Sequence, residues 1–177
     1  MLLVDKLFIV SMTATWIILF YHIFLTFGGY RHFVDTLTGK DMEEEMDEYP
    51  SISILIPAHN EEMVIGRTVD AMSRLIYPRE KLEIIVINDC SSDRTGEILA
   101  EKCKKIPNLQ VLTLVPPEGA KGKSNALNHG LAVSKGEYIV IYDADNTPER
   151  RAVMHLAQEI VQHDDLGEVV GKFRTRN

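Results

Sequence analysis

The sequence predicts an α/β protein with a mainly parallel sheet, preceded by one transmembrane helix. Short apolar segments alternate with segments whose apolar residues recur at helical spacing, and strands that alternate with helices are joined by right-handed crossovers into a parallel sheet. Ahead of them, residues 7–27 contain no Asp, Glu, Lys or Arg. At about 1.5 Å per residue this segment reaches across a hydrocarbon layer of roughly 30 Å.

The apolar segment 7–27 has two interpretations, a retained membrane helix and a cleaved signal peptide. The apolar region of a signal peptide is shorter and ends at a cleavage site of small residues, which this segment lacks. We therefore expect a membrane helix. Arg31, His32 and Lys40 follow it against only Lys6 before it, and this charge difference favours a cytosolic location for the rest of the chain. The predicted location is the cell membrane, with the globular domain in the cytosol.

The chain is predicted to have three parts: a transmembrane helix at 1–30, an acidic juxtamembrane linker at 31–50 and a globular domain at 51–177. The acidic run at 41–48 is typical of a solvated spacer. The formal net charge of -7 argues against a nucleic-acid-binding surface, because such a surface needs a basic face. The two cysteines have neither metal-ligand spacing nor a disulfide framework, so we expect reduced thiols.

Four strands are predicted in the globular domain, with a candidate for a fifth at the end: 51–56, 82–87, 111–115, 138–142 and 169–173. The segment 82–87 is almost continuously apolar, as expected for a sheet covered on both faces. We expect Pro57 to stop the first strand.

Four helices are predicted from apolar residues at helical spacing: one from Glu61 onward, one after the capping residues 91–93, one at 124–133 and one at 147–163. Thr147 is expected to cap the last of them, and Pro148 fits its first turn.

Polar residues collect at the carboxyl ends of the predicted strands, where parallel sheets bind their ligands. In an extended chain alternate side chains share a face, so Asp143 and Asp145 are expected to project the same way. Two carboxylates at the open end of a buried strand suit a divalent cation whose other ligands are phosphate oxygens. Asp89 can accept hydrogen bonds from a base or ribose, and Lys123 can neutralise a phosphate. If the sheet is parallel, these residues face one crevice.

Each polar cluster also has a purely structural interpretation. Residues 89–93 could serve only as helix caps, and Lys121 and Lys123 could be solvated loop lysines. His59 is more often an ordinary loop histidine than a catalytic one. The occurrence of all the clusters at successive strand ends is what favours a shared ligand site.

The chain resembles family 2 glycosyltransferases in four motifs that occur in the family's order: Pro57-Ala58-His59-Asn60-Glu61-Glu62, Asn88-Asp89-Cys90-Ser91-Ser92-Asp93, Gly122-Lys123-Ser124-Asn125-Ala126-Leu127-Asn128 and Asp143-Ala144-Asp145. The pattern is most similar to that of the membrane-bound polysaccharide synthases of the cellulose, chitin, hyaluronan and poly-N-acetylglucosamine type. The resemblance implies that residues 51–177 form the Rossmann-like, nucleotide-sugar-binding half of a GT-A fold.

The resemblance also implies the site residues. The donor-binding residues are then Pro57, Ala58, His59, Asn60, Glu61, Asp89, Lys123, Asn128, Asp143, Ala144 and Asp145. By motif position, the 57–61 loop and Asp89 would hold the uridine, and Lys123 would lie near the diphosphate. Asp145 would bind a Mg²⁺ or Mn²⁺ ion. Asp143 would lie near the nucleotide and close to the same ion.

The function implied by the resemblance is metal-dependent, inverting transfer of a sugar from a UDP-sugar to a growing polysaccharide or another acceptor. Two alternatives stay open, a non-catalytic membrane-anchored nucleotide-binding module and transfer of a single sugar to a lipid. The partners expected are therefore a UDP-sugar donor, a saccharide or lipid acceptor and the membrane, without nucleic acid.

The chain departs from the family pattern in three ways. Asn88 stands where the family often has an acid, and residues 124–125 stand where small residues are frequent. The family's catalytic base and its later Gln-x-x-Arg-Trp motif have no counterpart before Asn177, and the single tryptophan is Trp16. We therefore expect the donor-binding half of a larger enzyme, with no catalytic residue in this chain.

Two other nucleotide-binding classes are disfavoured. Gly122-Lys123-Ser124 resembles the end of a P-loop, but that pattern requires glycine at position 117, which is proline. A dehydrogenase would need Gly-x-Gly-x-x-Gly after the first strand, and the chain lacks it there.

Overall fold

The computed structural model describes residues 3–38, 46, 48–163 and 166–171. The chain divides into two compact units, Met1–Glu45 and Met46–Asn177. Most of the acidic run at 41–48 lies outside the described residues. The three-part division at residues 30 and 50 stays a prediction.

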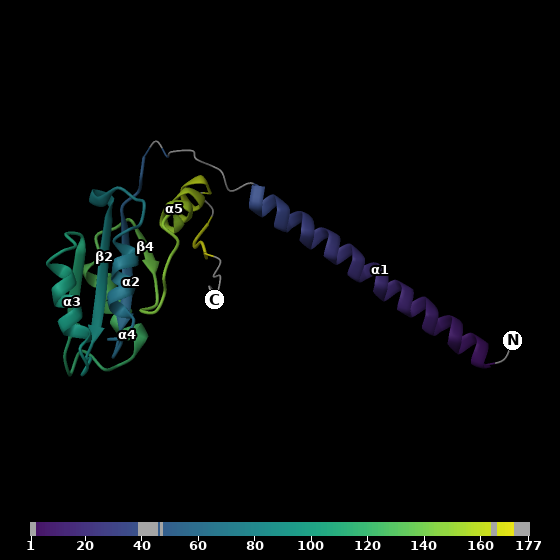
Figure 1. Cartoon of the computed structure of the whole chain (residues 1–177), viewed down its shortest axis with the longest axis horizontal. Coiled ribbons are helices and arrows are strands. Elements are labelled where there is room, and N and C mark those ends of the chain that lie inside the picture. The colour runs from purple at the N-terminus through teal and green to yellow at the C-terminus, as the bar shows by residue number, and fades with distance from the viewer. Residues whose placement is uncertain (1–2, 39–45, 47, 164–165, 172–177) are drawn as a thin grey trace. The chain divides into compact units, whose positions relative to one another are not determined.

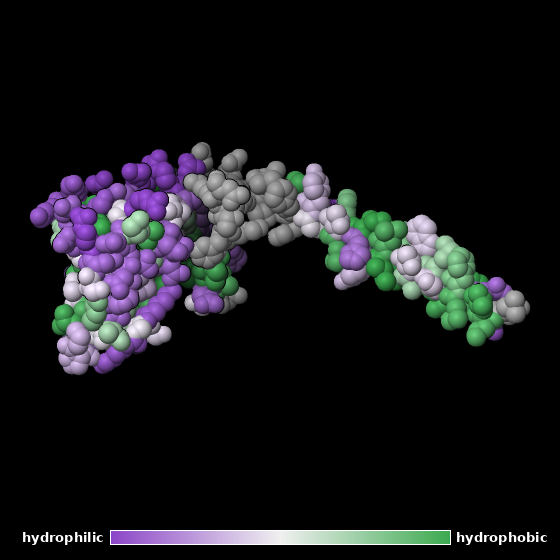
Figure 2. All heavy atoms as spheres, turned by 60° about the horizontal axis from the view of Figure 1, so that its bottom comes forward, coloured by the Kyte–Doolittle hydropathy of each residue, from purple (hydrophilic) through white to green (hydrophobic). Residues whose placement is uncertain are grey.

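The first unit contains one long helix, α1 (Leu3–Thr38). Its segment Leu3–Arg31 is 29 residues long and, by length and composition, is able to cross a membrane. It is longer at both ends than the predicted segment 7–27. Figure 2 shows apolar residues along most of this helix. The large apolar residues within Leu3–Arg31 expose about half or more of their surface, so the described chain does not bury them.

The second unit is built on a four-stranded parallel sheet with the order β3-β2-β1-β4 (Figure 1). The strands are β1 (Ile52–Ala58), β2 (Leu82–Asp89), β3 (Leu109–Leu114) and β4 (Tyr138–Ile141). The helices between and after them are α2 (Ile65–Met72), the short 3-10 helix η1 (Arg79–Lys81), α3 (Thr95–Cys103), α4 (Lys123–Val133) and α5 (Ala152–Gln162). The predicted parallel α/β sheet is confirmed.

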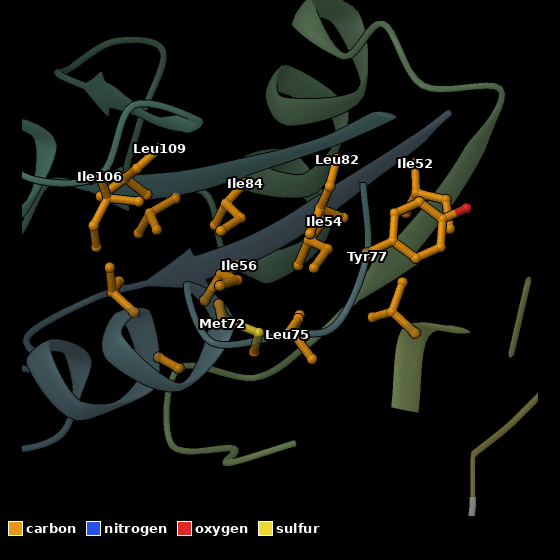
Figure 3. Packing of buried hydrophobic residues seen from close by; sticks show 14 of the residues in the cluster. Ile52, Ile54, Ile56, Met72, Leu75, Tyr77, Leu82, Ile84, Ile106 and Leu109 are labelled. Carbon is orange, nitrogen blue, oxygen red and sulfur yellow. The ribbon is translucent and has the colours of Figure 1, made fainter. Parts of the chain in front are cut away.

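Both faces of the sheet are covered, because alternate residues of β1 and β2 pack into two different hydrophobic clusters. On one face, Ile54 and Ile56 pack with residues of α2, α3 and α5, and Figure 3 shows them directed toward Met72 and Leu75. On the other face, Leu55 packs with residues of β2 and α4. Two-sided coverage explains the nearly unbroken apolar composition of the central strands.

The prediction that Pro57 stops the first strand is wrong, because β1 continues to Ala58. The carbonyls of Ser51 and Leu55 accept hydrogen bonds from the amides of residues 138 and 142, on the β4 side. Pro57 therefore directs its backbone nitrogen to the same side. The pairing of β1 with β4 ends at Leu55, so a proline there removes no ladder hydrogen bond.

Two predictions at the carboxyl-terminal end are also wrong. The last helix begins at Ala152, not at Thr147, and residues 147–150 are outside it. The carbonyl of Arg150 instead accepts a hydrogen bond of 2.7 Å from the amide of Ile76, which ties this segment to the loop after α2. The candidate fifth strand is not formed by its described residues, 169–171. Val170 is 77% exposed, so it has no sheet to pack on.

Candidate functional site

A cavity of about 570 Å³ lies at the carboxyl ends of β1 and β2 and beside the start of α4. It is lined by residues from all four predicted polar clusters: Pro57, Ala58, His59, Glu61, Asp89, Ala120, Gly122, Lys123, Ala126, Asp143, Ala144 and Asp145. Parallel strands direct their carboxyl ends to the same edge of the sheet, so loops far apart in the chain meet there.

Nine of the predicted site residues line this cavity, and two do not. Asn128 is exposed on α4 outside the lining, and Asn60 is turned toward the loop after β2. Three lining residues were not singled out from the sequence: Ala120, Gly122 and Ala126. Gly122 and Ala126 belong to the motif 122–128 named above, and Ala120 lies two residues before it, but as small uncharged residues they carried no chemical signal.

Asn60 joins the loop after β1 to the loop after β2. Its backbone amide donates to Ser91 Oγ at 3.0 Å, and its side-chain oxygen accepts from the amide of Ser92 at 2.8 Å. Asn60 has a positive φ of 57°, a conformation that asparagine tolerates better than most residues. Asn60 therefore shapes the wall of the cavity without lining it.

Asp93 strengthens the same connection. Its two carboxylate oxygens accept from the amide of Thr95 at 2.9 Å and from the amide of Glu62 at 3.1 Å. Loss of hydration opposes its charge, but these bonds and one from the Thr95 hydroxyl hold the pKa of Asp93 below its ordinary value. The predicted capping role of residues 91–93 holds only in part: the N-cap of α3 is Arg94, without a side-chain cap bond, and of the three only Asp93 bonds the first amide of the helix, that of Thr95. Asp93 also joins the two loops.

His59 is fixed by two hydrogen bonds. Its Nδ1 lies 2.6 Å from the carbonyl oxygen of Asp89, and its Nε2 lies 3.1 Å from Nδ2 of Asn60. A carbonyl only accepts, so Nδ1 carries the proton and donates it. In the neutral ring Nε2 then accepts from the Asn60 amide. This places His59 at the cavity in one defined orientation.

The carboxylate of Asp89 is buried at the base of the cavity, with 6% of the residue exposed. Its Oδ1 accepts from the backbone amide of Ala120 at 2.6 Å. Gly119 allows this approach: a Cβ at that position would lie 2.8 Å from Asp89 Oδ1 and 2.9 Å from Leu114 Cβ. The loop after β3 therefore closes over Asp89 only because residue 119 has no side chain.

Asp143 and Asp145 both line the cavity, although not for the reason the sequence suggested. β4 ends at Ile141, and the two aspartates lie in a turn after the strand, where the amide of Asn146 donates to the carbonyl of Asp143 at 3.1 Å. The residue between them, Ala144, is buried, while both aspartates are exposed. The turn thus places two carboxylates at the solvent side of the cavity.

Lys123, the first residue of α4, forms an ion pair with Asp143. Each side chain is 55% exposed, so the pair contributes little to stability. The ion pair instead fixes a position, because it holds the ammonium group of Lys123 beside the turn that carries Asp143 and Asp145. Gly122 and Ala126, at the amino-terminal end of α4, also line the cavity. The partial positive charge of a helix amino terminus favours a bound anion there.

The residues at the cavity suit a divalent cation only together with other ligands. Among the described residues, no group of three or more His, Cys, Asp and Glu side chains could hold a metal ion. Asp143 and Asp145 supply carboxylate oxygens, which Mg²⁺ and Mn²⁺ prefer, and such ions in phosphate-binding sites take their other ligands from phosphate and water. The donor set therefore fits a cation that binds together with a phosphorylated ligand.

The same residues match a known family. The model of the family described as "Glycosyl transferase family 2" matches residues 53–176. The chain belongs to glycosyltransferase family 2. The resemblance expected from the four motifs is therefore confirmed, and the cavity lies in the part of the glycosyltransferase chain that the family model covers.

Several curated proteins are similar to this chain of glycosyltransferase family 2. A probable glycosyltransferase, YdaM, of Bacillus subtilis (strain 168) is 48% identical over 174 residues, which are 98% of this chain and 41% of that protein. A beta-monoglucosyldiacylglycerol synthase of Trichormus variabilis is 36% identical, covering 72% of this chain and 27% of that protein. A poly-beta-1,6-N-acetyl-D-glucosamine synthase of Staphylococcus epidermidis is 35% identical, covering 77% and 32%. The chain thus spans less than half the length of these relatives.

Solved structures support the same fold. TarS 1–349 of S. aureus in complex with UDP-GlcNAc is 28% identical with a TM-score of 0.56, covering 64% of this chain and 32% of that one. The mannosyltransferase PcManGT of Pyrobaculum calidifontis in complex with GDP-Man and Mn²⁺ is 26% identical with a TM-score of 0.58, covering 67% and 36%. The described sheet of this family 2 chain is therefore GT-A-like, as the motifs implied.

Proposed function

We propose that this chain forms the donor-binding part of a metal-dependent, inverting glycosyltransferase that uses a UDP-sugar. The observation that carries the proposal is that Asp89, Lys123 and the Asp143–Asp145 turn, from separate strand ends, line one cavity. Family membership supports it, as does the similarity to a protein in complex with UDP-GlcNAc.

Asp89 is proposed to bind the nucleoside. Its carboxylate is buried and Oδ1 already accepts one hydrogen bond from the Ala120 amide. An ionised carboxylate has further acceptor capacity, and an N–H of uracil or a ribose hydroxyl at the cavity would satisfy it. Lost hydrogen bonds to a buried charged group are costly, so Asp89 distinguishes ligands that donate from those that do not.

The diphosphate is proposed to lie between Lys123 and the aspartate turn. Lys123 Nζ would then share its charge between Asp143 and a phosphate oxygen. Asp145, with Asp143, would hold Mg²⁺ or Mn²⁺, and such an ion stabilises the negative charge of the departing diphosphate. Preorganised positive groups at this position favour the leaving of UDP more than the binding of the intact donor.

The acceptor hydroxyl is proposed to attack the anomeric carbon with inversion while UDP leaves, and a general base must take its proton. We assign that base to no residue of this chain. The acceptor is a saccharide or a lipid, since relatives named for a polysaccharide and for a glycolipid both match. The 177-residue chain is therefore expected to bind UDP with the metal ion and to transfer little or no sugar.

The N-terminal helix is proposed to hold the enzyme in the cell membrane, with residues 46–177 in the cytosol. The length and composition of Leu3–Arg31 support this. The excess of positive residues after the apolar segment 7–27 over those before it supports the orientation. Protease added outside spheroplasts should leave residues 46–177 intact; their digestion would contradict the proposed orientation.

Calorimetric titration of the 177-residue chain, in detergent micelles, tests the binding function. UDP should release heat with 1:1 stoichiometry in the presence of Mn²⁺ and bind more weakly in EDTA. GDP serves as the matched control for base recognition and should bind more weakly than UDP. Absence of heat from folded protein would contradict the proposal. The 177-residue chain alone is expected to transfer little or no sugar, so a sugar-transfer assay compares it with a version extended to the natural stop codon. Transfer by the extended version identifies an enzyme, and its absence there identifies a non-catalytic binding module.

A further inference from the structure

We propose that Thr68, a buried residue of α2 that does not line the cavity, is a positioning residue for the metal-binding turn. This inference rests on the proposed function of Asp143 and Asp145. It adds a residue that lies 76 positions before Ala144 in the chain and makes its contact through the back of the turn.

The contact is a buried hydrogen bond. The Thr68 hydroxyl donates to the carbonyl oxygen of Ala144 at 2.6 Å, and its distance to the carbonyl of Val64 in its own helix is 3.3 Å. A threonine hydroxyl has one hydrogen, so the shorter contact is the bond that it makes. Thr68 is 1% exposed and Ala144 is 5% exposed, and water therefore has little access to this carbonyl.

Ala144 is the middle residue of Asp143-Ala144-Asp145. Its side chain packs in the same hydrophobic cluster as Ile65 and Val69 of α2. The carbonyl bond to Thr68 and this packing hold the peptide units on either side of Ala144. Those peptide units set the directions of the two carboxylates, which are themselves exposed. The orientation of both metal-binding side chains thus depends on a residue behind them.

Removal of the Thr68 hydroxyl would leave the Ala144 carbonyl buried without its partner. Such a group is costly, so the turn would rotate the carbonyl toward water or another donor. Rotation of the peptide units would spread the orientations of Asp143 and Asp145. Residues that orient metal ligands typically change metal affinity by about 10- to 100-fold when they are replaced.

The test compares three variants of the full 177-residue chain in detergent micelles. Thr68→Val removes the hydroxyl and nearly keeps the shape, and Thr68→Ser keeps the hydroxyl. Tyr77→Phe is the matched control, because the buried Tyr77 hydroxyl also donates to a backbone carbonyl, that of Pro50 at 2.7 Å, away from the cavity lining.

Two measurements are made on each variant: the affinity for Mn²⁺ in the presence of UDP, by electron paramagnetic resonance, and hydrogen exchange of the Asn146 amide. Thr68→Val should weaken Mn²⁺ binding about tenfold or more, leave UDP binding in EDTA unchanged and speed exchange at Asn146. Thr68→Ser should resemble the original chain. Tyr77→Phe should alter neither property.

These measurements distinguish an error in the proposed metal site from an error in the role of Thr68. If the unaltered chain takes up no Mn²⁺ with UDP, the proposed metal site is wrong. Hydrogen exchange still tests whether the bond from Thr68 to the Ala144 carbonyl holds the turn. The inference is overturned if the Asn146 amide exchanges equally fast in Thr68→Val and in the original chain. If the metal binds but Thr68→Val binds it equally well, or Tyr77→Phe loses as much affinity, Thr68 has no positioning role.

Discussion

The backbone amide of Ala120 donates a 2.6 Å hydrogen bond to Oδ1 of Asp89, a buried carboxylate 31 residues earlier in the chain. This bond brings the loop after β3 over the end of β2. It thereby closes the bottom of the cavity where the nucleoside is proposed to bind. It also sets one carboxylate oxygen in a fixed direction before any ligand binds, which reduces the entropy lost on binding.

Gly119→Ala should weaken this arrangement. The added Cβ would lie 2.8 Å from Asp89 Oδ1 and 2.9 Å from Leu114 Cβ, so the loop must move. Overpacking of this kind costs about 1–3 kcal/mol of unfolding free energy, and UDP affinity should fall as well. Denaturant unfolding and calorimetry measure the two effects. Gly167→Ala is the control, because nothing lies within 4 Å of a Cβ there; equal effects from both variants would contradict the prediction.

Asp145→Ala should abolish the Mn²⁺ dependence of UDP binding, because it removes the carboxylate that we place on the metal. The expected result is one weak UDP affinity, the same in Mn²⁺ and in EDTA, measured by calorimetry. Asp70→Ala removes a carboxylate that pairs with Lys102 away from the cavity lining and should retain the metal effect. A full metal effect in Asp145→Ala would show that the ion binds elsewhere.

Lys123→Gln should lower the affinity for UDP much more than that for uridine, because the lysine is proposed to counter phosphate charge. Its ion pair with Asp143 is half exposed, so stability should change by less than about 1 kcal/mol. Lys121→Gln removes a nearby exposed lysine that is not in the cavity lining and controls for net charge. Equal losses for UDP and uridine would place Lys123 away from the diphosphate.

The hydrogen bonds of Asp93 to the amides of Thr95 and Glu62 predict that the stability of the fold decreases at acid pH. The pKa of Asp93 is lower in the folded chain than its ordinary value, so the ionised carboxylate stabilises the fold above the unfolded-state pKa of about 3.9. This contribution is lost as the pH falls through the lower folded-state pKa. Asp93→Asn should therefore be less stable than the original chain at pH 7, with a smaller difference near pH 2. Unfolding by denaturant at both pH values measures this, and a constant difference would refute it.

The sequence predicted the core of the fold well because its signals are local. Continuous apolar runs such as the one at 82–87 mark buried parallel strands, and the polar clusters follow where those strands end. Asp89, Lys123, Asp143 and Asp145 were identified in this way, and all four line the cavity. Local signals were less reliable at boundaries: Pro57 lies within β1 because its nitrogen faces a position that β4 no longer reaches.

The tertiary structure decided how the site is held. The amino-acid sequence alone determined which chemical groups occur at the strand ends, since residue type and short-range periodicity are readable without coordinates. It did not determine that Asn60 turns toward Ser92, that Gly119 admits Ala120 to Asp89, or that Thr68 supports Ala144. These contacts join residues tens of positions apart, and a hydrogen bond between them depends on ångström-scale placement that only the packed sheet and helices define.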